Sequence, residues 1–420
     1  MVEHALCPLD ARFSLQRGFT HQTSYRFTDA HGQRKMAQVQ VDCSRGLSAG
    51  DEFYLWGLLA LTFAQHESSP DFYATPHYCL RELGVIESGS KGGKSYRLFR
   101  ESLSRLAGVR YENDCFFDPI RKEHRQVSFG LLGYSLPLDP LSSRAWRIVW
   151  DTQFFEICQA AGGRLRFDLA LYRRLDPASR RLLLLLLKVF YRHKKSPRFG
   201  LRELMIDTLG FSDQLSNSKL KTKLQRAGCV LRREGVIVGG VQFGRRGQSH
   251  YVEFCRGPLL EQVSGFADSS SLVESPLIEP LTKIGLELPD AKRVLKAYRR
   301  DLVRIWCDVT IVAMEKREKG FFRRSPAAYL INSLQAASRG ERTPPDWFLA
   351  VQKQEERHRA ETARPRPKDT LSHPTLAIDP KLSGNDLISE MIAQFRAAGQ
   401  SLSDAKQNAE RFANARRCRS

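Results

Sequence analysis

Long hydrophobic runs are absent from this 420-residue chain. The longest purely apolar run, Leu182–Leu187, is bounded by Arg181 and Lys188, whereas a helix that crosses a bilayer needs about 20 apolar residues. The first ten residues contain acids and a proline where a secretory signal has a basic patch and an apolar core. We therefore expect a soluble, cytoplasmic protein that does not enter a membrane.

Motifs of metal binding and catalysis are also lacking. The nine cysteines form no C-x-x-C pair and the ten histidines no H-E-x-x-H, so we expect no metal. No G-x-S-x-G elbow occurs, and the glycine-rich loop before Lys94 misses the P-loop pattern because Ser88 stands where a glycine is needed. These absences favour a protein that is not an enzyme and needs no cofactor. A basic glycine loop before a helix is still suited to hold a DNA phosphate.

Positive charge is what the chain has in excess. Lys and Arg number 66 against 46 Asp and Glu, which gives a net charge of +20. Nearly half of this charge lies within residues 191–260, where 14 basic and 5 acidic residues give +9. Positive charge concentrated on a folded segment indicates a polyanionic partner, and we expect DNA. A basic face that only keeps the protein soluble is the alternative.

Two stretches of the chain predict the same order of elements. In the first, the alternation of Met36–Cys43 predicts a strand, and a capping signal at Ser48 opens the first of three helices before a hairpin. In the second, a strand at Arg147–Trp150 precedes three helices and another hairpin, with Asp176 and Pro177 starting the first helix. This order is the plan of a winged-helix domain. The predicted helices are 53–63, 77–83, 96–107, 176–192, 201–209 and 219–227, the last closed by Gly228, and a long helix is predicted over 291–319.

The predicted fold class is α+β, with two tandem winged-helix domains followed by a mostly helical C-terminal region. Pro, Lys and Arg are frequent between 364 and 379, which is typical of a flexible linker. The predicted division is an N-terminal winged-helix domain at 1–145, a second, basic one at 146–260, a linker at 261–287, a helical region at 288–350, a flexible linker at 351–384 and a C-terminal amphipathic helix at 385–420.

The predicted helix at 219–227 has the pattern of a helix that reads a DNA groove. Leu220, Leu224 and Ala227 share one face, which should pack into the domain. Arg and Gln reach base edges, lysines contact phosphates, and a two-arginine turn between glycines suits a DNA backbone or a narrow minor groove. An ordinary solvated helix face is the alternative. The DNA-contact residues predicted here are Ser218, Lys219, Lys221, Thr222, Lys223, Gln225, Arg226, Arg245 and Arg246.

The first module repeats this pattern more weakly. Its predicted helix at 96–107 buries Leu98, Phe99, Leu103 and Leu106, and Glu101 lies among the basic residues of the other face. A module used for dimerisation or as a scaffold is the alternative to DNA contact. The DNA-contact residues predicted here are Lys91, Lys94, Arg97, Arg100 and Ser104.

Four runs carry a resemblance to a known family: DEFYLWGLLA (51–60), YRLFRESLSRLAGV (96–109), SRRLLLLLLKVFYR (179–192) and SNSKLKTKLQRAG (216–228). With the doubled plan, they resemble the replication initiator protein A family of bacterial plasmids. The resemblance implies a protein that binds repeated double-stranded DNA sites at a plasmid origin, helps to open the duplex and recruits the host replicative helicase or its loader. In related tandem winged-helix initiators one module also forms a self-repressing dimer, so monomer and homodimer are both open here.

Two other functions are left open by the sequence. A winged-helix transcriptional regulator or self-repressor would share the DNA-binding pattern and add a ligand pocket or a dimer core. An interaction protein would instead use the tail of the chain, where apolar residues recur at helical spacing. Such a helix would dock on a helicase, a chaperone or a second copy, or would pack on the body. The residues predicted for partner binding are Leu387, Ile388, Met391, Ile392 and Phe395.

Overall fold

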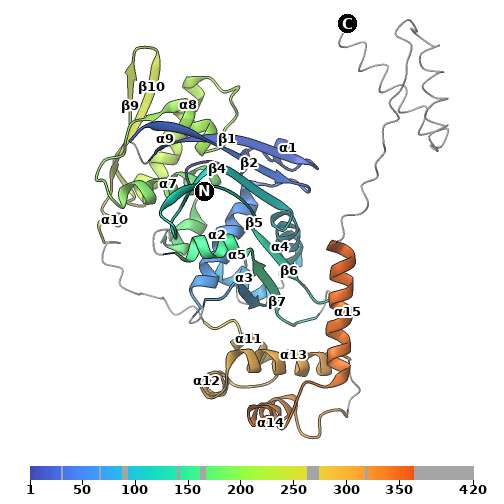
Figure 1. Cartoon of the computed structure of the whole chain (residues 1–420). Coiled ribbons are helices and arrows are strands. Elements are labelled where there is room, and N and C mark those ends of the chain that lie inside the picture. The colour runs from blue at the N-terminus through green and yellow to red at the C-terminus, as the bar shows by residue number, and fades with distance from the viewer. Residues whose placement is uncertain are drawn as a thin grey trace, which may run out of the picture. The chain divides into compact units, whose positions relative to one another are not determined.

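The computed structural model of the chain has an α+β fold with small antiparallel sheets and a helical region toward the C-terminus, which confirms the predicted fold class (Figure 1). Its contacts divide the chain into two units, Met1–Leu349 and Ala350–Ser420. The predicted partner-binding residues from Leu387 to Phe395 lie outside the described residues, as does Lys91. The structure describes residues 1–29, 32–65, 68–87, 93–139, 142–160, 167–262, 274–316 and 320–363.

The first module is built on a four-stranded antiparallel sheet in the order β1-β2-β4-β5. β2 pairs with β1 along its whole length but with β4 only from Val39 to Cys43. β1 was not predicted, because Phe19, Tyr25 and Phe27 are its only large apolar residues and they do not alternate regularly. The strands are β1 (Phe19–Thr28), β2 (Arg34–Cys43), β4 (Val109–Asp118) and β5 (Glu123–Gly130).

Three helices and a second sheet complete the first module. A capping box between Ser48 and Asp51 starts α2, and the hydroxyl of Thr75 accepts the backbone N–H of Tyr78 to start α3. The second sheet has the order β3-β7-β6. The helices are α2 (Ala49–Phe63), α3 (Pro76–Glu82) and α4 (Gly93–Leu106), and the strands are β3 (Asp71–Ala74), β6 (Leu132–Ser135) and β7 (Trp146–Trp150).

The end of the first module lies beyond the predicted boundary at residue 145. β7, which the sequence placed at the start of the second module, pairs with β3 and β6 of the first. Helix α5 (Thr152–Gln159) follows and packs on the same module, with the rings of Phe154 and Phe129 5.8 Å apart. A lone strand has no partner that sequence can identify, and this pairing is set by the tertiary fold.

In the second module two helices precede a short strand, which is followed by two short helical segments, a longer helix and a hairpin. Asp176 accepts two backbone N–H groups at the start of α7, and Pro177 fills the first turn, as predicted. Its sheet has the order β8-β10-β9. The elements are α6 (Leu169–Arg174), α7 (Pro177–Phe190), β8 (Phe199–Gly200), α8 (Leu201–Glu203), the π-helical turn η1 (Leu204–Thr208), α9 (Asn217–Arg233), β9 (Ile237–Arg246), β10 (Ser249–Arg256) and α10 (Leu259–Gln262).

The C-terminal helices differ from the prediction in three ways, of which the first is that α11 (Ile278–Lys283) lies within the predicted linker at 261–287. The long helix expected over 291–319 is broken at Tyr298, whose extended backbone (φ −126°, ψ 153°) separates α12 from α13. Residues 351–363, assigned to a flexible linker, are helical. The hydrophobic spacing continues across Tyr298, so periodicity alone does not show the break. The helices are α11 (Ile278–Lys283), α12 (Leu288–Ala297), α13 (Arg300–Lys316), α14 (Pro326–Ser338) and α15 (Asp346–Ala363).

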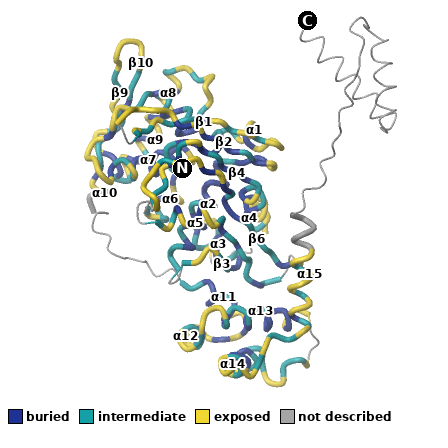
Figure 2. Tube along the Cα trace, viewed as in Figure 1, coloured by how far each residue is buried: buried dark blue, intermediate teal, exposed yellow. Residues whose placement is uncertain are grey.

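The two modules share one hydrophobic core, which runs from Leu6 to Leu260 in the sequence. Helix α7 packs against α2 of the first module and α9 of the second. Its apolar run is buried on all sides, since Leu182 to Leu186 are each less than 5% exposed (Figure 2). A run of leucines without polar interruption is thus the mark of a helix enclosed by both modules.

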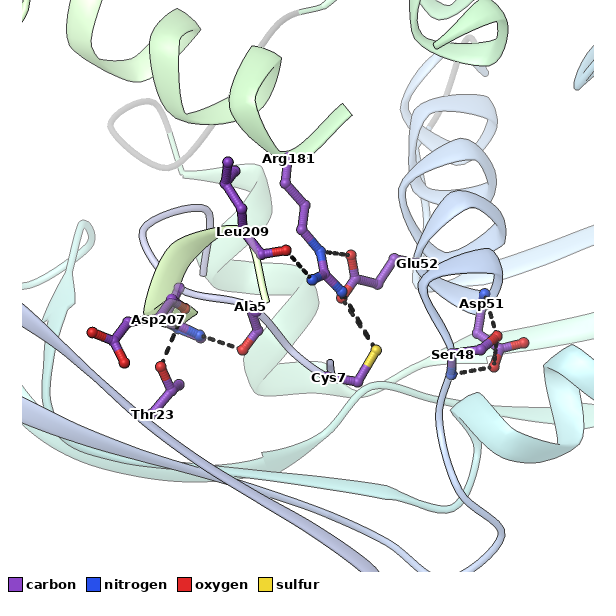
Figure 3. Close-up of polar contacts among 10 residues, drawn as sticks. Ala5, Cys7, Thr23, Ser48, Asp51, Glu52, Arg181, Asp207 and Leu209 are labelled. Carbon is purple, nitrogen blue, oxygen red and sulfur yellow. Dashed lines mark hydrogen bonds and ion pairs between the residues drawn. The ribbon is translucent and has the colours of Figure 1, made fainter. Parts of the chain in front are cut away.

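A buried ion pair joins α2 to α7. The Arg181 guanidinium donates to both carboxylate oxygens of Glu52, at 2.6 and 2.8 Å, and both side chains are less than 10% exposed (Figure 3). Further donors of the guanidinium reach the carbonyl of Leu209 at 2.7 Å and the sulfur of Cys7 at 3.4 Å. Burial opposes the charge of Arg181, but Glu52 raises its pKa above the ordinary value. The buried guanidinium is thus held by three residues from distant parts of the chain.

The segment before α1 (Ala11–Ser14) lies between the modules. The backbone N–H of Ala5 donates to the carbonyl of Asp207 at the end of η1, and Leu9 donates to Gly210. His4 lies 2.9 Å from the hydroxyl of Tyr111 in the first module. We call residues 3–9 the strap, because they bond to both modules.

Breaking the Glu52–Arg181 pair should be costly. Glu52→Leu or Arg181→Met alone leaves a buried charge without its partner, which we expect to lower the free energy of unfolding by about 3–5 kcal/mol. The double variant Glu52→Leu/Arg181→Met should lose less than the sum of the two, because no charge is left buried. Urea unfolding measures all three variants. The control is Arg299→Met, in an exposed pair with Asp301, which should leave stability unchanged. Additive losses would show that the two side chains are not coupled.

Two histidines, His4 in the strap and His21 in β1, predict a loss of stability in acid. Burial lowers the pKa of His4 well below its usual range, and burial with the nearby charge of Arg181 lowers that of His21 to about 4. Both are neutral in the fold, whereas the unfolded chain protonates them below about pH 6.5. The unfolding free energy should therefore fall from pH 6.5 toward 4, by up to about 1.4 kcal/mol per pH unit for each histidine. Urea unfolding at several pH values should show a shallower slope for His21→Gln, and an unchanged one for the exposed His193→Gln. Equal slopes for the natural chain, His21→Gln and His193→Gln would contradict the neutral state assigned to His21 in the fold.

Candidate nucleic-acid interface

Helix α9 is positioned by its cap and by its apolar stripe. The hydroxyl of Ser216 accepts the backbone N–H of Lys219, which fixes the first turn. Leu220, Leu224, Ala227 and Leu231 are buried against the domain. The opposite face is therefore turned to solvent.

Most of the predicted contact residues lie on that exposed face of α9. Ser218, Thr222, Gln225 and Cys229 follow one another at three- and four-residue spacing, and all four are exposed. Lys219, Lys223 and Arg226 flank this stripe and are exposed as well. The structure thus brings six of the seven residues predicted on the helix to one face: Ser218, Lys219, Thr222, Lys223, Gln225 and Arg226.

Lys221 is the exception among these residues. It is half-buried, and its ammonium group lies 3.3 Å from Nδ1 of His250 and 5.8 Å from the ring centre of Phe243. His250 and Phe243 belong to the hairpin, so Lys221 bridges α9 and the hairpin. The sequence placed Lys221 on the flank of the helix but gave no sign of the hairpin packed against it.

The helix does not end at Gly228, as the sequence suggested, but continues to Arg233. Gly228 is buried where α9 crosses β9, and a Cβ at this position would overlap Cγ2 of Val241. The glycine therefore permits close packing of helix and hairpin instead of closing the helix. Residues 230–233 therefore belong to the same helix.

A pair of consecutive glycines shapes the hairpin. Gly239 and Gly240 have φ of 70° and 78°, and the pairing register of β9 and β10 shifts between Glu253 and Cys255 opposite them. Two consecutive left-handed residues form a bulge that only glycine adopts without strain. The tip carries Arg245 and Arg246, both exposed, with Arg245 Nε donating to the carbonyl of Gly247 at 2.7 Å.

Arg202 is a residue of this interface that the sequence gave no reason to select. Its guanidinium donates to the carbonyls of Asp213 at 2.6 Å and Leu215 at 3.1 Å and to the side chain of Asn217 at 3.4 Å. These three acceptors form the turn that leads into α9. Arg202 therefore holds the start of the helix, a role that becomes visible only when the turn is folded.

The charges of the second module are arranged so that the cations of this face are free. Three of the five acids in 191–260 are engaged elsewhere: Glu203 with Arg26, Glu234 with Arg174, and Glu253 with Lys195 and Arg198. Within the described ranges, none of the cations of α9 or of the hairpin tip forms an ion pair. The positive potential of this face is therefore not neutralised by the protein's own acids. We call the exposed side chains of α9 and the hairpin tip the basic face.

The first module offers less free charge. On α4, Lys94, Arg97 and Arg100 are exposed, but Arg97 lies 3.9 Å from Glu101. Ser104 is half-buried and bonds to Arg45. Leu98, predicted to be buried, is 42% exposed, because it lies on the solvent side of the helix next to the buried Phe99.

In the part of the chain that the structure describes, no group of three or more His, Cys, Asp and Glu is placed to hold a metal ion. No described helix has the length and apolar character needed to cross a membrane.

Comparison with known proteins finds no matching family model and no matching curated protein. Among solved structures, a crystal structure of domains 2 and 3 of RctB is similar with a TM-score of 0.40 and 14% sequence identity, over 57% of this chain and 92% of that one. A likeness at this level identifies neither a family nor a function.

The packing at Gly228 predicts that the effect of Gly228→Ala on the unfolding free energy changes sign when Val241 is made smaller. In the natural chain, Gly228→Ala gains about 1 kcal/mol of helix propensity but should lose about 1–3 kcal/mol to strain against Val241, for a net loss. In a Val241→Ala background the space is open, and Gly228→Ala should be stabilising. Urea unfolding of the four proteins decides this. A stabilising Gly228→Ala in the natural chain would contradict the close approach.

Proposed function

We propose that this chain is a sequence-specific double-stranded DNA-binding protein that acts as a plasmid replication initiator and has no catalytic activity of its own. The observation that carries the proposal is the basic face: an exposed helix and a two-arginine hairpin tip whose cations have no described acidic partner. A solvated helix face that binds nothing would be expected to pair some of these cations with the acids of its own module. The resemblance to the replication initiator protein A family supports the initiator role.

In this proposal the two parts of the basic face have different tasks. Gln225 and Arg226 lie on the helix face and are long enough to form paired hydrogen bonds with purine edges in the major groove. Lys219 and Lys223 bind phosphates and set the register of the helix on the duplex. Arg245 and Arg246 contact the flanking backbone or enter a narrow minor groove.

The remaining parts of the chain would carry the other steps of initiation. Opening of the duplex follows from binding to repeated sites, and recruitment of a helicase or its loader needs a surface away from the DNA. Homodimer formation through the first module belongs to the same proposal, since its α4 has less free charge. A transcriptional regulator is the second candidate, because the basic face serves a promoter equally well. Direct repeats of about two helical turns, roughly 20 base pairs, next to the gene would favour the initiator.

Two substitutions on α9 should separate base reading from phosphate contact. Arg226→Ala is expected to weaken binding to a duplex selected from a random library by about 1–3 kcal/mol and to relax sequence preference at one position. Lys223→Ala should weaken selected and unselected duplexes alike and reduce the dependence of log K on log salt by about one. Gel shift and salt titration measure both.

The matched control is Lys292→Ala, an exposed lysine on α12 outside the basic face. It should leave affinity and salt dependence unchanged. If Lys223→Ala and Lys292→Ala have the same effect, only the total charge matters and the basic face is wrongly placed. A reporter plasmid that fails to replicate while promoter binding is retained would favour the regulator over the initiator.

A further inference from the structure

A cavity lies where the hairpin of the first module meets the ends of α5 and α7. It has a volume of about 660 Å³, and its walls are mostly apolar. The lining residues are Phe117, Pro119, Ile120, Lys122, Glu156, Gln159, Ala160 and Arg192. We call it the junction pocket. It is formed by the turn between β4 and β5 and by residues more than thirty positions away along the chain.

Large apolar side chains are exposed around this pocket. Among the lining residues, Phe117 is 48% and Ile120 54% exposed. Single exposed apolar residues are common, but two in the lining of one cavity are typical of an interaction surface. Aromatic residues and arginine are also the types enriched at the centres of protein interfaces.

The hairpin turn that presents Ile120 is held rigidly. Asp118 accepts the backbone N–H groups of Ile120 and Arg121 on its carboxylate, at 2.8 and 3.1 Å, and that of Lys122 on its carbonyl, at 2.8 Å. Lys122 has a φ of 60°, the one non-glycine residue with positive φ in the described part of the chain. A strained turn that is fixed by three hydrogen bonds is preorganised, so binding would cost little conformational entropy.

The charges at the rim indicate the chemistry of the partner. Lys122 and Arg192 line the pocket, and neither forms an ion pair with another described residue. Asp118 and Glu123, the acids of the turn, share one cation, Arg125, at 3.8 and 3.4 Å, and neither lines the pocket. Glu156 is the single acid of the lining. An apolar cavity with a cationic rim is complementary to apolar side chains flanked by carboxylates.

We propose that the junction pocket docks a short acidic segment of a partner protein, which inserts apolar side chains beside Phe117 and Ile120 and places carboxylates on Lys122 and Arg192. A nucleic-acid strand fits the pocket less well, because the walls are mostly apolar and a sugar-phosphate chain has no apolar side chains to insert. This site is separate from the basic face, so it does not depend on DNA binding.

The test uses the full-length chain and three fluorescein-labelled 12-residue amphipathic peptides. One carries Leu and Phe on one face and Glu and Asp on the other, the second has lysine for each acid, and the third has serine for each Leu and Phe. Fluorescence anisotropy should show binding of the first peptide and at least tenfold weaker binding of the other two. Equal binding of the acidic and lysine peptides, or no binding of the acidic one, would overturn the proposal.

Variants of the full chain locate the site. Ile120→Asp and Lys122→Glu should each weaken the acidic peptide at least tenfold, because each adds a negative charge at the pocket. The matched controls are Met36→Asp, an exposed apolar residue of β2, and Lys283→Glu, an exposed lysine of α11, which should change binding less than twofold. Ile120→Ser repeats the test made with Ile120→Asp, but adds no charge and places only a hydroxyl at the exposed turn.

Two further readouts distinguish a peptide site from a nucleic-acid site. Ile120→Asp and Lys122→Glu should each change the affinity for the selected duplex less than twofold. The peptide result therefore does not depend on whether the basic face binds DNA. A labelled 20-nucleotide single strand should bind the natural chain and the variants alike. If the variants lose that strand and keep the peptide, the pocket belongs to nucleic acid and the proposal is wrong.

Discussion

The buried pair of Glu52 and Arg181 is the constraint on which the two-module arrangement depends. A buried arginine needs acceptors for its donors, and the acceptors of Arg181 come from α2, the strap and the residue that follows η1. Each of those segments must be in place before the charge is satisfied. The pair thus selects one relative placement of the two modules, and the shared apolar core stabilises that placement.

The anchoring of the two modules also positions the basic face. Because α7 contacts both α2 and α9, the helix proposed to read DNA is anchored through α7 to the first module. Acids that would neutralise its cations are held elsewhere by other arginines and lysines. Stability and the proposed DNA binding involve separate sets of charges: the buried Glu52–Arg181 pair fixes the fold, and the cations of the basic face have no ion-pair partner among the described residues.

The sequence predicted most of the helices because their caps and apolar periods are local signals. Ser48 and Asp176 start their helices as expected. It failed where the deciding contact is distant in the chain, as in the pairing of β7 and the passage of α9 through Gly228, and it missed the break at Tyr298, across which the apolar spacing continues. The candidate site shows the same division between local signals and contacts that form only in the folded chain. The exposed stripe of α9 was predictable from spacing, whereas the clamp by Arg202 and the turn of Lys221 toward the hairpin required the folded loops.

The enclosed leucine run of α7 has a consequence for dissecting the protein. Cutting the chain between the modules would uncover Leu182 to Leu186 on the side that α2 covers, and would leave Arg181 without Glu52. Such a fragment would present an apolar, charge-bearing surface and would tend to self-associate. Oligomers seen with an isolated second module would then result from the newly exposed surface and not from a natural assembly.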